Sequence, residues 1–448
     1  MKALMDNDRL DKKAALQDIL LASRSLAVYR GLEELPPLKL LRELLEGLLE
    51  DLWKPSKLVE AYYSFVNAFL SGENLALSSN YSSWKMWILD TVLHTENDFT
   101  LKGENHPEDI SKSMITAVAH DLDCIVRLAN IPWATLISIL EDRMGQGKIL
   151  NIFDQDDERN WLDLCRSKGL EGWDVDYLIS YYRNKGCGLF SIYKGFYWNG
   201  KFLEGIEHID PITLNQLIGY DTQKDILMDN TEKFLSGYAA NNVLLYGDKG
   251  TGKSSMIKAL VHEYGDRGLR IIELPRIYLD DYHKILKAVE NRRFKFILFV
   301  DDLSFEEHEV EYKHIKALLE GGLKVRPSNL LVYATSNRRH LVRQLASDRS
   351  STGYHYNDRD EISPTDSMQE KLSLADRFGI TLTFISPNQK GYLEMIESMA
   401  RERGIDMERK ILYEKALRWE KKYNGRSGRT AKQFIDDLAA ADSAGNHS

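Results

Sequence analysis

Residues 247–254 read Gly-Asp-Lys-Gly-Thr-Gly-Lys-Ser, which fits the phosphate-loop pattern G-x-x-x-x-G-K-S/T. The apolar stretch 242–246 precedes this pattern, and apolar residues follow it at helical spacing, at Met256, Ile257 and Leu260. Glycines let the backbone curl so that several N–H groups point at one polyphosphate, and the N-terminus of the next helix adds positive potential. The stretch therefore predicts a strand, a phosphate-binding loop and a helix. The residues predicted to hold a nucleotide are Gly247, Asp248, Lys249, Gly250, Thr251, Gly252, Lys253, Ser254 and Ser255.

Four side chains in and after this loop suit the chemistry of a nucleotide. Lys253 can reach the β- and γ-phosphates, and the Ser254 hydroxyl can ligate Mg²⁺, which prefers oxygen ligands. The apolar run 294–300 ends in Asp301 and Asp302, and Asp301 lies 48 residues after Lys253. A carboxylate at the end of an adjacent strand can hold Mg²⁺ or its waters, so Asp301 is the predicted metal ligand beside Ser254. Asp302 is predicted to orient or deprotonate an attacking water. No NKxD-type sequence that selects guanine occurs, which favours ATP over GTP.

The second half of the chain alternates between short apolar runs and amphipathic segments. This alternation predicts a parallel sheet covered on both faces. The expected strands are 242–246, 269–274, 294–300, 329–334 and 380–384, and the expected helices between them are 253–263, 278–290 and 310–319. After Pro387 the pattern indicates helices alone, at 390–403, 408–421 and 430–438. The stretch 347–368 lacks periodicity and is expected to be a surface loop.

The first half of the chain has helical periodicity, clearest in the leucine stripe of residues 38–53. The expected helices are 38–53, 57–70, 83–93, 112–128 and 132–143. The aromatic stretches 177–182 and 190–198 are partly strand-like and are interpreted as a bridge. His120 and Asp121 are expected to be ordinary residues on a helix surface. We therefore expect three domains, which are a mainly helical one at 1–205, a nucleotide-binding one at 206–386 and a helical one at 387–448.

Charge and composition limit the partners. The net charge is −9, and residues 1–200 carry 22 basic and 30 acidic side chains against 37 and 38 in the rest. An acidic first half argues against a broad nucleic-acid-binding face there. No apolar run of about 18 residues occurs, so we expect no membrane span. The polar N-terminus and the odd set of Cys124, Cys165 and Cys187 favour a reducing cytoplasm.

With its two motifs in this order, the segment from about 206 to 438 resembles the AAA+ ATPases. More narrowly, it is similar to a family of bacterial predicted ATPases of unknown function in which this phosphate loop accompanies the acid motif DDLSFE, here residues 301–306. The resemblance covers a little over half of the chain. It implies an α/β P-loop fold, with a RecA-like parallel sheet followed by a small helical lid, and hydrolysis of ATP with Mg²⁺.

The resemblance also implies three catalytic positions. Asn337 follows the strand 330–334 and matches the polar residue that orients water, with Thr335 as a second candidate, although Asn337 also suits a helix cap. Arg377 matches the arginine that reaches into a neighbouring subunit's ATP, which implies a homo-oligomer. An ordinary surface ion pair of Arg377 with Asp376 or Glu370 stays open.

The third implied position lies in the lid. Arg429, near the start of the last helix, matches an arginine aimed at the nucleotide, with Arg426 as the runner-up and a basic loop without a ligand as the alternative. Residues 217–220 resemble the segment that packs against adenine.

Two departures from the AAA+ pattern affect the expected activity. Most active members have Asp-Glu at the acid motif, whereas this chain has Asp301-Asp302, whose second side chain is one methylene shorter. Hydrolysis is therefore expected to be slow, or to be assisted by Glu306. The aromatic–apolar–glycine loop of polypeptide-threading machines is missing after Leu274, which disfavours a protein-unfolding ring.

The sequence thus predicts an ATP-hydrolysing AAA+ protein that drives conformational change in a partner or assembly. The helical N-terminal domain is the expected contact for an unknown protein partner. Two alternatives stay open, which are a nucleotide-gated interaction protein with little turnover and a nucleic-acid-associated loader or remodelling ATPase. The basic run 338–340 with Arg343 could touch phosphate backbones, but a solvated helix face or a subunit contact is the favoured interpretation of that run.

Overall fold

The computed structural model describes residues 2–50, 53–71, 83–145, 148–153, 174–303, 318–319, 327–337, 377–423 and 425–445. Contacts divide the chain into two compact units, Met1–Ile192 and Tyr193–Ser448. The predicted loop 347–368, most of the predicted helix 310–319, residues 304–306 of the acid motif and the basic run 338–343 lie outside the described residues.

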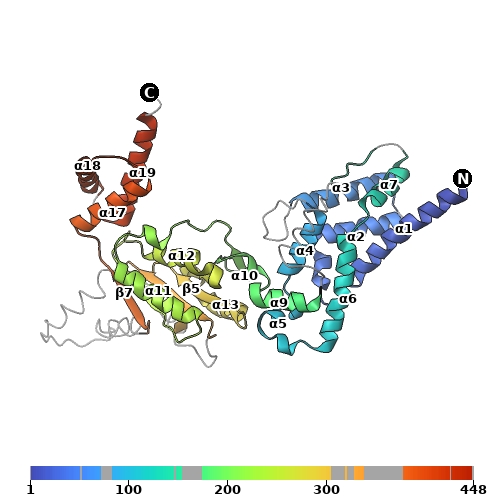
Figure 1. Ribbon diagram of the computed structural model, residues 1–448, viewed down its shortest axis with the longest axis horizontal. Coiled ribbons are helices and arrows are strands. Elements are labelled where there is room, and N and C mark those ends of the chain that lie inside the picture. The colour runs from blue at the N-terminus through green and yellow to red at the C-terminus, as the bar shows by residue number, and fades with distance from the viewer. Residues whose placement is uncertain are drawn as a thin grey trace, which may run out of the picture. The chain divides into compact units, whose positions relative to one another are not determined.

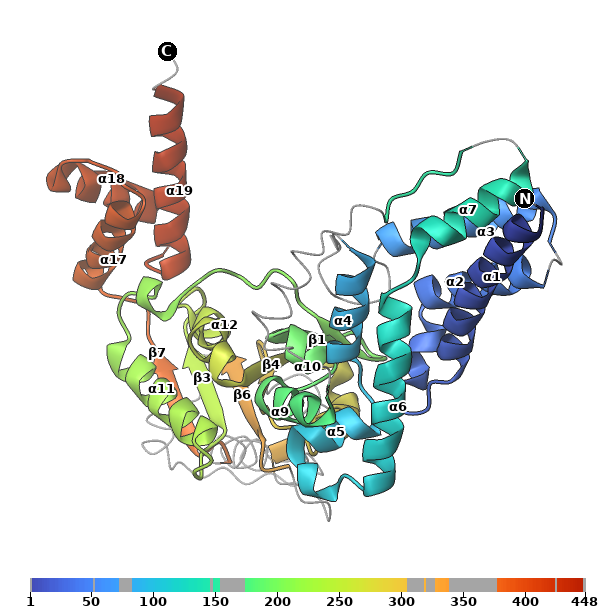
Figure 2. The ribbon, with the colours of Figure 1, turned by 45° about the vertical axis from the view of Figure 1, so that its right-hand side comes forward.

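Helices build the described part of the first unit, as the sequence predicts (Figure 1). These are α1 (Lys2–Arg24), η1 (Arg30–Glu34), α2 (Pro36–Leu49), α3 (Pro55–Ser71), α4 (Trp84–His94), α5 (Asp98–Asn105), η2 (Pro107–Asp109), α6 (Lys112–Ala129), α7 (Trp133–Met144), α9 (Val175–Lys185) and α10 (Leu189–Ile192). Helices α1, α2, α3 and α7 pack side by side (Figure 2). The stripe of α2 lies inside the core, where Leu41, Leu44, Leu45 and Leu48 are buried.

Aromatic rings fill the rest of this core. The rings of Trp133 and Phe153 stack with centroids 3.9 Å apart, and Phe65 stacks on both. Trp84 meets Phe65 edge-on, and its indole N–H donates to the carbonyl of Leu128 at 2.7 Å. Large rings bury much apolar area at little entropic cost, so this cluster stabilises the unit.

The aromatic stretch 177–182 is helical, so its strand-like interpretation is wrong. It lies in α9, where Asp174 caps the N-terminus by accepting from the N–H of Tyr177 at 2.6 Å. Val175, Leu178 and Tyr182 are buried at helical spacing, and the other aromatic side chains lie outside that stripe.

Asp121 is a buried anchor and not a helix-surface residue, which corrects the prediction. Its side chain is 0% exposed, and its two carboxylate oxygens accept from the N–H groups of Ala27, Val28 and Tyr29 at 2.7–2.8 Å. These three residues turn the chain between α1 and η1. A carboxylate that accepts several backbone N–H bonds is strongly stabilised, so Asp121 fixes this turn.

Asp121→Asn is expected to lower the free energy of unfolding by about 2 kcal/mol, because an amide nitrogen would then face backbone donors. Chemical denaturation would measure the loss. The control is Asp123→Asn on the same helix, where the side chain is exposed and little change is expected. Equal stability of the two variants would contradict the anchoring role.

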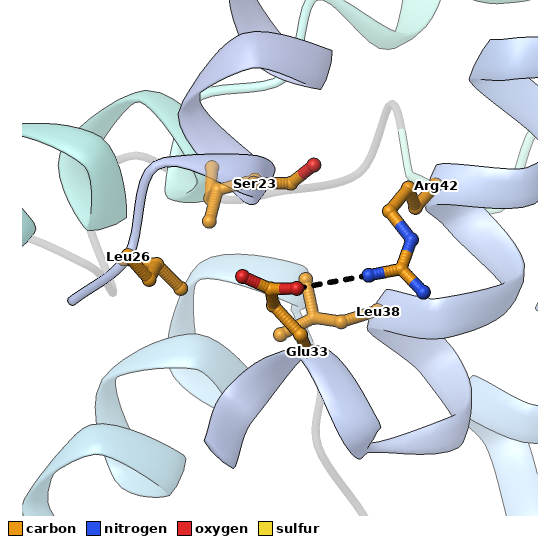
Figure 3. Close-up of a pocket in the computed structure, with 6 residues that line it drawn as sticks. Ser23, Leu26, Glu33, Leu38 and Arg42 are labelled. Carbon is orange, nitrogen blue, oxygen red and sulfur yellow. Dashed lines mark hydrogen bonds and ion pairs between the residues drawn. The ribbon is translucent and has the colours of Figure 1, made fainter. Parts of the chain in front are cut away.

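A small cavity lies between α1, η1 and α2 (Figure 3). It is lined by Ser23, Leu26, Glu33, Leu38, Arg42 and Leu128. The Glu33 carboxylate accepts from the Arg42 guanidinium at 3.0 Å across it. The volume is about 10 Å³, which leaves room for at most one water molecule, so the cavity is not a site for a larger ligand.

No single helix among the described residues is long and apolar enough to cross a membrane. By length and composition alone, α6 and α7 pass such a test as a pair that is bent by 57° at the break between them.

A seven-stranded sheet organises the second unit, and its strand order is β2-β1-β4-β5-β6-β3-β7. Its strands are β1 (Gly195–Trp198), β2 (Leu203–Gly205), β3 (Val243–Gly247), β4 (Leu269–Glu273), β5 (Lys295–Val300), β6 (Leu330–Ser336) and β7 (Ile380–Phe384). Neighbouring strands pair in parallel, except for the antiparallel hairpin of β1 and β2. The five predicted strands are β3 to β7, and each begins and ends within two residues of its predicted bounds.

Helices cover this sheet and follow it in the chain (Figure 1). They are η3 (Leu214–Gln216), α11 (Asp221–Leu235), α12 (Lys253–Tyr264), η4 (Gly265–Arg267), η5 (Arg276–Asp281), α13 (Tyr282–Val289), α17 (Gln389–Glu402), α18 (Arg409–Lys422) and α19 (Gly428–Gly445). Alternate residues of β3, Val243 and Leu245, pack with Ile257 and Leu260 of α12 and with Leu227 of α11. The last three helices form their own small core, so the predicted P-loop sheet with a C-terminal helical lid is confirmed.

Candidate phosphate-binding site

The loop between β3 and α12 has the curled backbone that its glycines predict. Gly247, Gly250 and Gly252 adopt φ values of 139°, 76° and 90°. A Cβ at Gly247 would overlap the backbone carbonyl of Phe384 in β7, so this position needs a residue without a side chain. Gly252 precedes α12 directly, so the free N–H groups of that helix face the loop.

Lys253 fills the curl of the loop. The side chain is buried at 4% exposure, and Nζ donates to the carbonyl oxygens of Gly247 at 3.1 Å and Asp248 at 2.7 Å. Burial lowers the pKa of Lys253 to about 8, and the nearby carboxylates of Asp248, Asp301 and Asp302 partly oppose that shift. The Lys253 ammonium group has three N–H donors and bonds to these two carbonyl oxygens, so it can still donate to a polyphosphate ligand.

Three oxygen-bearing side chains meet beside this lysine. The hydroxyl of Ser254 donates to Asp301 Oδ1 at 2.6 Å, and the hydroxyl of Thr335 donates to the same oxygen at 2.5 Å. Hydroxyl and carboxylate oxygens are the donors that Mg²⁺ prefers, and Mg²⁺ usually keeps several waters beside one or two protein ligands. Ser254 and Asp301 therefore fit the predicted metal ligands in chemistry and in proximity.

Asp302 and Asn337 lie together, as expected of two groups that handle one water. The Asn337 amide donates to Asp302 Oδ1 at 2.5 Å. Asp302 adopts φ 52°, the left-handed region, and its N–H donates to Asp301 Oδ1 and to the Thr335 hydroxyl. Such backbone strain persists only where surrounding bonds hold it, and these two bonds hold the backbone of Asp302.

The acid motif does not end a strand adjacent to the phosphate-loop strand, which corrects that part of the prediction. The strand β6 lies between β5 and β3. Thr335 lies near the end of β6, and its hydroxyl links this strand to the acid motif after β5 by donating to Asp301. From the sequence, Thr335 was the second candidate for orienting water. In the structure, its hydroxyl donates to the Asp301 carboxylate and thereby positions it.

The lid contacts the loop through the start of α19. The backbone N–H of Arg429 donates to the carbonyl of Gly250 at 3.2 Å, so the backbone of this arginine lies in contact with the loop. Arg426, the runner-up, pairs with Glu420 of α18 at 2.8 Å. This arrangement favours Arg429 for a contact with phosphate.

Arg377 lies far from the loop of its own chain. It precedes β7, whose last residue, Phe384, pairs with Gly247. Arg377 to Gly379 form a turn before the strand, and Gly379 lies against Asn241 just before β3, so Arg377 sits towards the opposite end of the parallel strands. The proposed ion-pair partners Asp376 and Glu370, and the assisting Glu306, lie outside the described residues.

The segment 217–220 lies between the loop and the lid. The Tyr220 hydroxyl donates to the carbonyl of Ile385 at 2.7 Å, and its ring packs against Phe384. Ile218 and Tyr220 also pack on the lid core. These apolar side chains are placed where a base could stack, next to the phosphate loop.

The Asp248 side chain is a contact that sequence reasoning missed. Its Oδ2 accepts from the N–H of Ser386 at 2.9 Å and from the Ser386 hydroxyl at 2.6 Å. The two residues are 138 positions apart. Nothing in the local sequence around Ser386 signals this pairing.

Together, the sheet, the glycine loop with its buried lysine and the helical lid define a P-loop protein of the AAA+ architecture. The chain belongs to the family described as "Protein of unknown function (DUF815)", whose sequence model matches residues 191–442. No curated protein matches the chain.

Three solved structures illustrate what the chain is similar to over about half of its length. The Holliday junction branch migration motor RuvB of Thermotoga maritima is 16% identical, with 51% of this chain and 73% of that chain covered and a TM-score of 0.31. The FIGL-1 AAA domain in complex with ADP is 15% identical, with 52% and 74% covered and a TM-score of 0.36. The HORMA:CdnC:Trip13 complex of E. coli MS115-1 is 14% identical, with 50% and 89% covered and a TM-score of 0.31.

Proposed function

We propose that the protein binds ATP with Mg²⁺ at residues 247–255 and hydrolyses it to ADP and phosphate. The observation that carries the proposal is the buried ammonium of Lys253 inside a glycine-curled loop, beside the hydroxyl–carboxylate pair of Ser254 and Asp301. A buried cation without a carboxylate partner of its own is costly, and a triphosphate would offset that cost.

Each residue has a definite task in this proposal. The loop N–H groups and Lys253 bind the β- and γ-phosphates, while Ser254 and Asp301 are the residues that would hold the metal. Mg²⁺ supplies charge neutralisation between those phosphates. Asp302 accepts a proton from the attacking water, and Asn337 orients that water through the bond to Asp302. Arg429 contacts the γ-phosphate from the lid.

Assembly is part of the same proposal. Because Arg377 lies towards the opposite end of β7 from the phosphate loop of its own chain, it acts on the ATP of a neighbouring copy or not at all. A homo-oligomer with this arginine in trans follows. Hydrolysis would then drive a conformational change in that assembly or in a protein partner held by the helical first unit.

Steady-state phosphate release under saturating Mg-ATP tests the reaction. We expect slow but continuous turnover, and Asp302→Asn is expected to lower kcat by about 100-fold because the general base is lost. The matched control is Asp225→Asn on α11, an exposed position away from the loop, where kcat should be unchanged. Turnover that is equal in Asp302→Asn and in the parent would remove Asp302 from the mechanism.

A nucleotide-gated switch with little turnover is the second candidate. It is favoured by the shorter Asp302, whose carboxylate is already bonded to Asn337. Tight binding of Mg-ATP without phosphate release above background would show that the protein is a switch with little turnover.

Binding should depend on pH through Lys253. Its pKa of about 8 means that the free protein loses this positive charge as the pH rises through 8, while bound phosphates favour the charged form. The affinity for Mg-ATP should therefore fall by up to about tenfold per pH unit above 8, with uptake of close to one proton at pH 9. Calorimetry in buffers of different ionisation enthalpy measures that uptake. A flat affinity between pH 7.5 and about 9.5 would contradict the assignment.

A further inference from the structure

The side chain of Asp248 points away from the phosphate cradle, toward the segment that joins the sheet to the lid. Its Oδ2 takes both donors of Ser386, the backbone N–H and the hydroxyl. Hydrogen bonds to an ionised acceptor are about twice as strong as neutral ones. The first half of the phosphate loop is therefore tied to a residue that belongs to neither the loop nor the lid core.

Ser386 lies in a connection of four residues. Strand β7 ends at Phe384, and α17 begins at Gln389 after Pro387 and the capping residue Asn388. A proline within so short a segment restricts its backbone, so a shift at Ser386 moves the start of α17. The position of Asp248 is thus linked to the position of the lid.

The same residue is linked to the phosphate-binding lysine. Lys253 Nζ donates to the carbonyl of Asp248 at 2.7 Å, and the Thr251 hydroxyl donates to that oxygen at 2.8 Å. When Lys253 turns toward phosphates, the carbonyl of Asp248 loses its charged donor. The Thr251 hydroxyl is then the remaining donor to this carbonyl, so the peptide after Asp248 can shift, and the Asp248 carboxylate carries that shift to Ser386.

Electrostatics sets this carboxylate apart from an ordinary loop residue. A negative charge in the loop repels a triphosphate, and it takes no part in the cradle of N–H groups. The two donors from Ser386 partly compensate this charge, which also acts on Lys253. An uncharged residue would serve binding alone better, so the charge serves the contact with Ser386 in the segment that leads to the lid.

We propose that the Asp248–Ser386 contact is a latch that transmits phosphate binding from Lys253 to the lid. This inference rests on the proposed function, because it requires that Mg-ATP binds at the loop. Asp248 and Ser386 act here as positioning residues.

Hydrogen–deuterium exchange of the full chain, read in peptides that cover residues 384–392, tests the latch. The probe is a non-hydrolysable ATP analogue with Mg²⁺, and its dissociation constant is measured by calorimetry for every variant. The variants are Asp248→Asn and Ser386→Ala, with Ser398→Ala in α17 as the matched control for a serine hydroxyl. In the parent, we expect the analogue to change exchange in this segment by about threefold or more.

Without nucleotide, Asp248→Asn should speed exchange of the Ser386 amide by about tenfold, because its acceptor loses the charge. The dissociation constant of Ser386→Ala for the analogue should lie within about threefold of that of the parent. This variant should lose at least about half of the nucleotide-dependent change in exchange. Asp248→Asn, which alters the loop itself, should lose nearly all of that change when the analogue is added at a concentration that saturates this variant. Ser398→Ala should behave as the parent.

The outcomes separate this proposal from the previous one. If Asp248→Asn and Ser386→Ala keep the full nucleotide-dependent change, the latch is wrong and ATP binding stands. If the parent binds the analogue but exchange in residues 384–392 does not change, the latch is wrong and the proposed ATP binding stands. If the parent shows no binding of the analogue, the proposed function and the latch both fail, and the nucleotide-free exchange rates then report a structural contact alone.

Discussion

Lys253→Ala is expected to weaken the binding of Mg-ATP by about 1000-fold, which corresponds to ~4 kcal/mol. The ammonium is placed to donate charge-assisted hydrogen bonds to two phosphates, and each such bond contributes about 1.5–3 kcal/mol. Calorimetry measures the affinity, and the proton uptake expected for the parent at pH 9 should vanish in the variant. The fold should survive, because the carbonyl of Asp248 keeps the Thr251 hydroxyl as a donor.

Lys258→Ala provides the control for this result. Lys258 lies one helical turn beyond Ser254 on α12 and pairs with Glu273 at 3.5 Å, outside the phosphate loop. Its removal takes away the same charge and the same side-chain length, so the affinity should change by less than about threefold. An affinity of Lys253→Ala that matches the parent would refute the phosphate site as a whole.

Gly247→Ala is expected to destabilise the second unit by about 4 kcal/mol or more, because the new methyl group would overlap a backbone atom. The φ of 139° lies in a region that residues with a side chain rarely adopt, and the carbonyl of Phe384 occupies the space where Cβ would stand. Strands β3 and β7 would have to separate at their paired ends. Thermal unfolding measures the loss, and Mg-ATP binding should disappear with it.

Gly237→Ala isolates the effect of the overlap from that of the dihedral angle. Gly237 also has a positive φ, 82°, and a Cβ there would meet no atom within 4 Å. Its cost should be the strain of the left-handed conformation alone, about 1–2 kcal/mol. Similar losses at the two glycines would mean that the contact with Phe384 yields easily and that the loop is not braced by β7.

Local patterns were sufficient for the strands and helices that surround the loop. The runs at β3, β5 and β7 are short, apolar and bounded by polar or turn residues, and their bounds were predicted within two residues. Helix α11 was not predicted, because Leu227 and Phe234 are among the few apolar side chains that it buries. Helix α1 was not predicted either, because the sequence at its start is similarly polar.

The site was predictable in its residue types but not in its pairings. Register between β5 and β6 places Val300 opposite Ala334, and this brings Thr335 next to Asp301. Register is set by contacts across the whole sheet, so two separate stretches of sequence cannot specify it. The contact of Asp248 with Ser386 arises in the same way, through the pairing of Gly247 with Phe384.

The hairpin of β1 and β2 has a practical consequence for dividing the chain. It runs alongside β4 and pairs with it through residues 195–197, so it covers backbone groups that would otherwise be an open sheet edge. A fragment that begins at residue 206 would expose this edge to other copies and invite aggregation, whereas one that begins at residue 193 would keep it shielded.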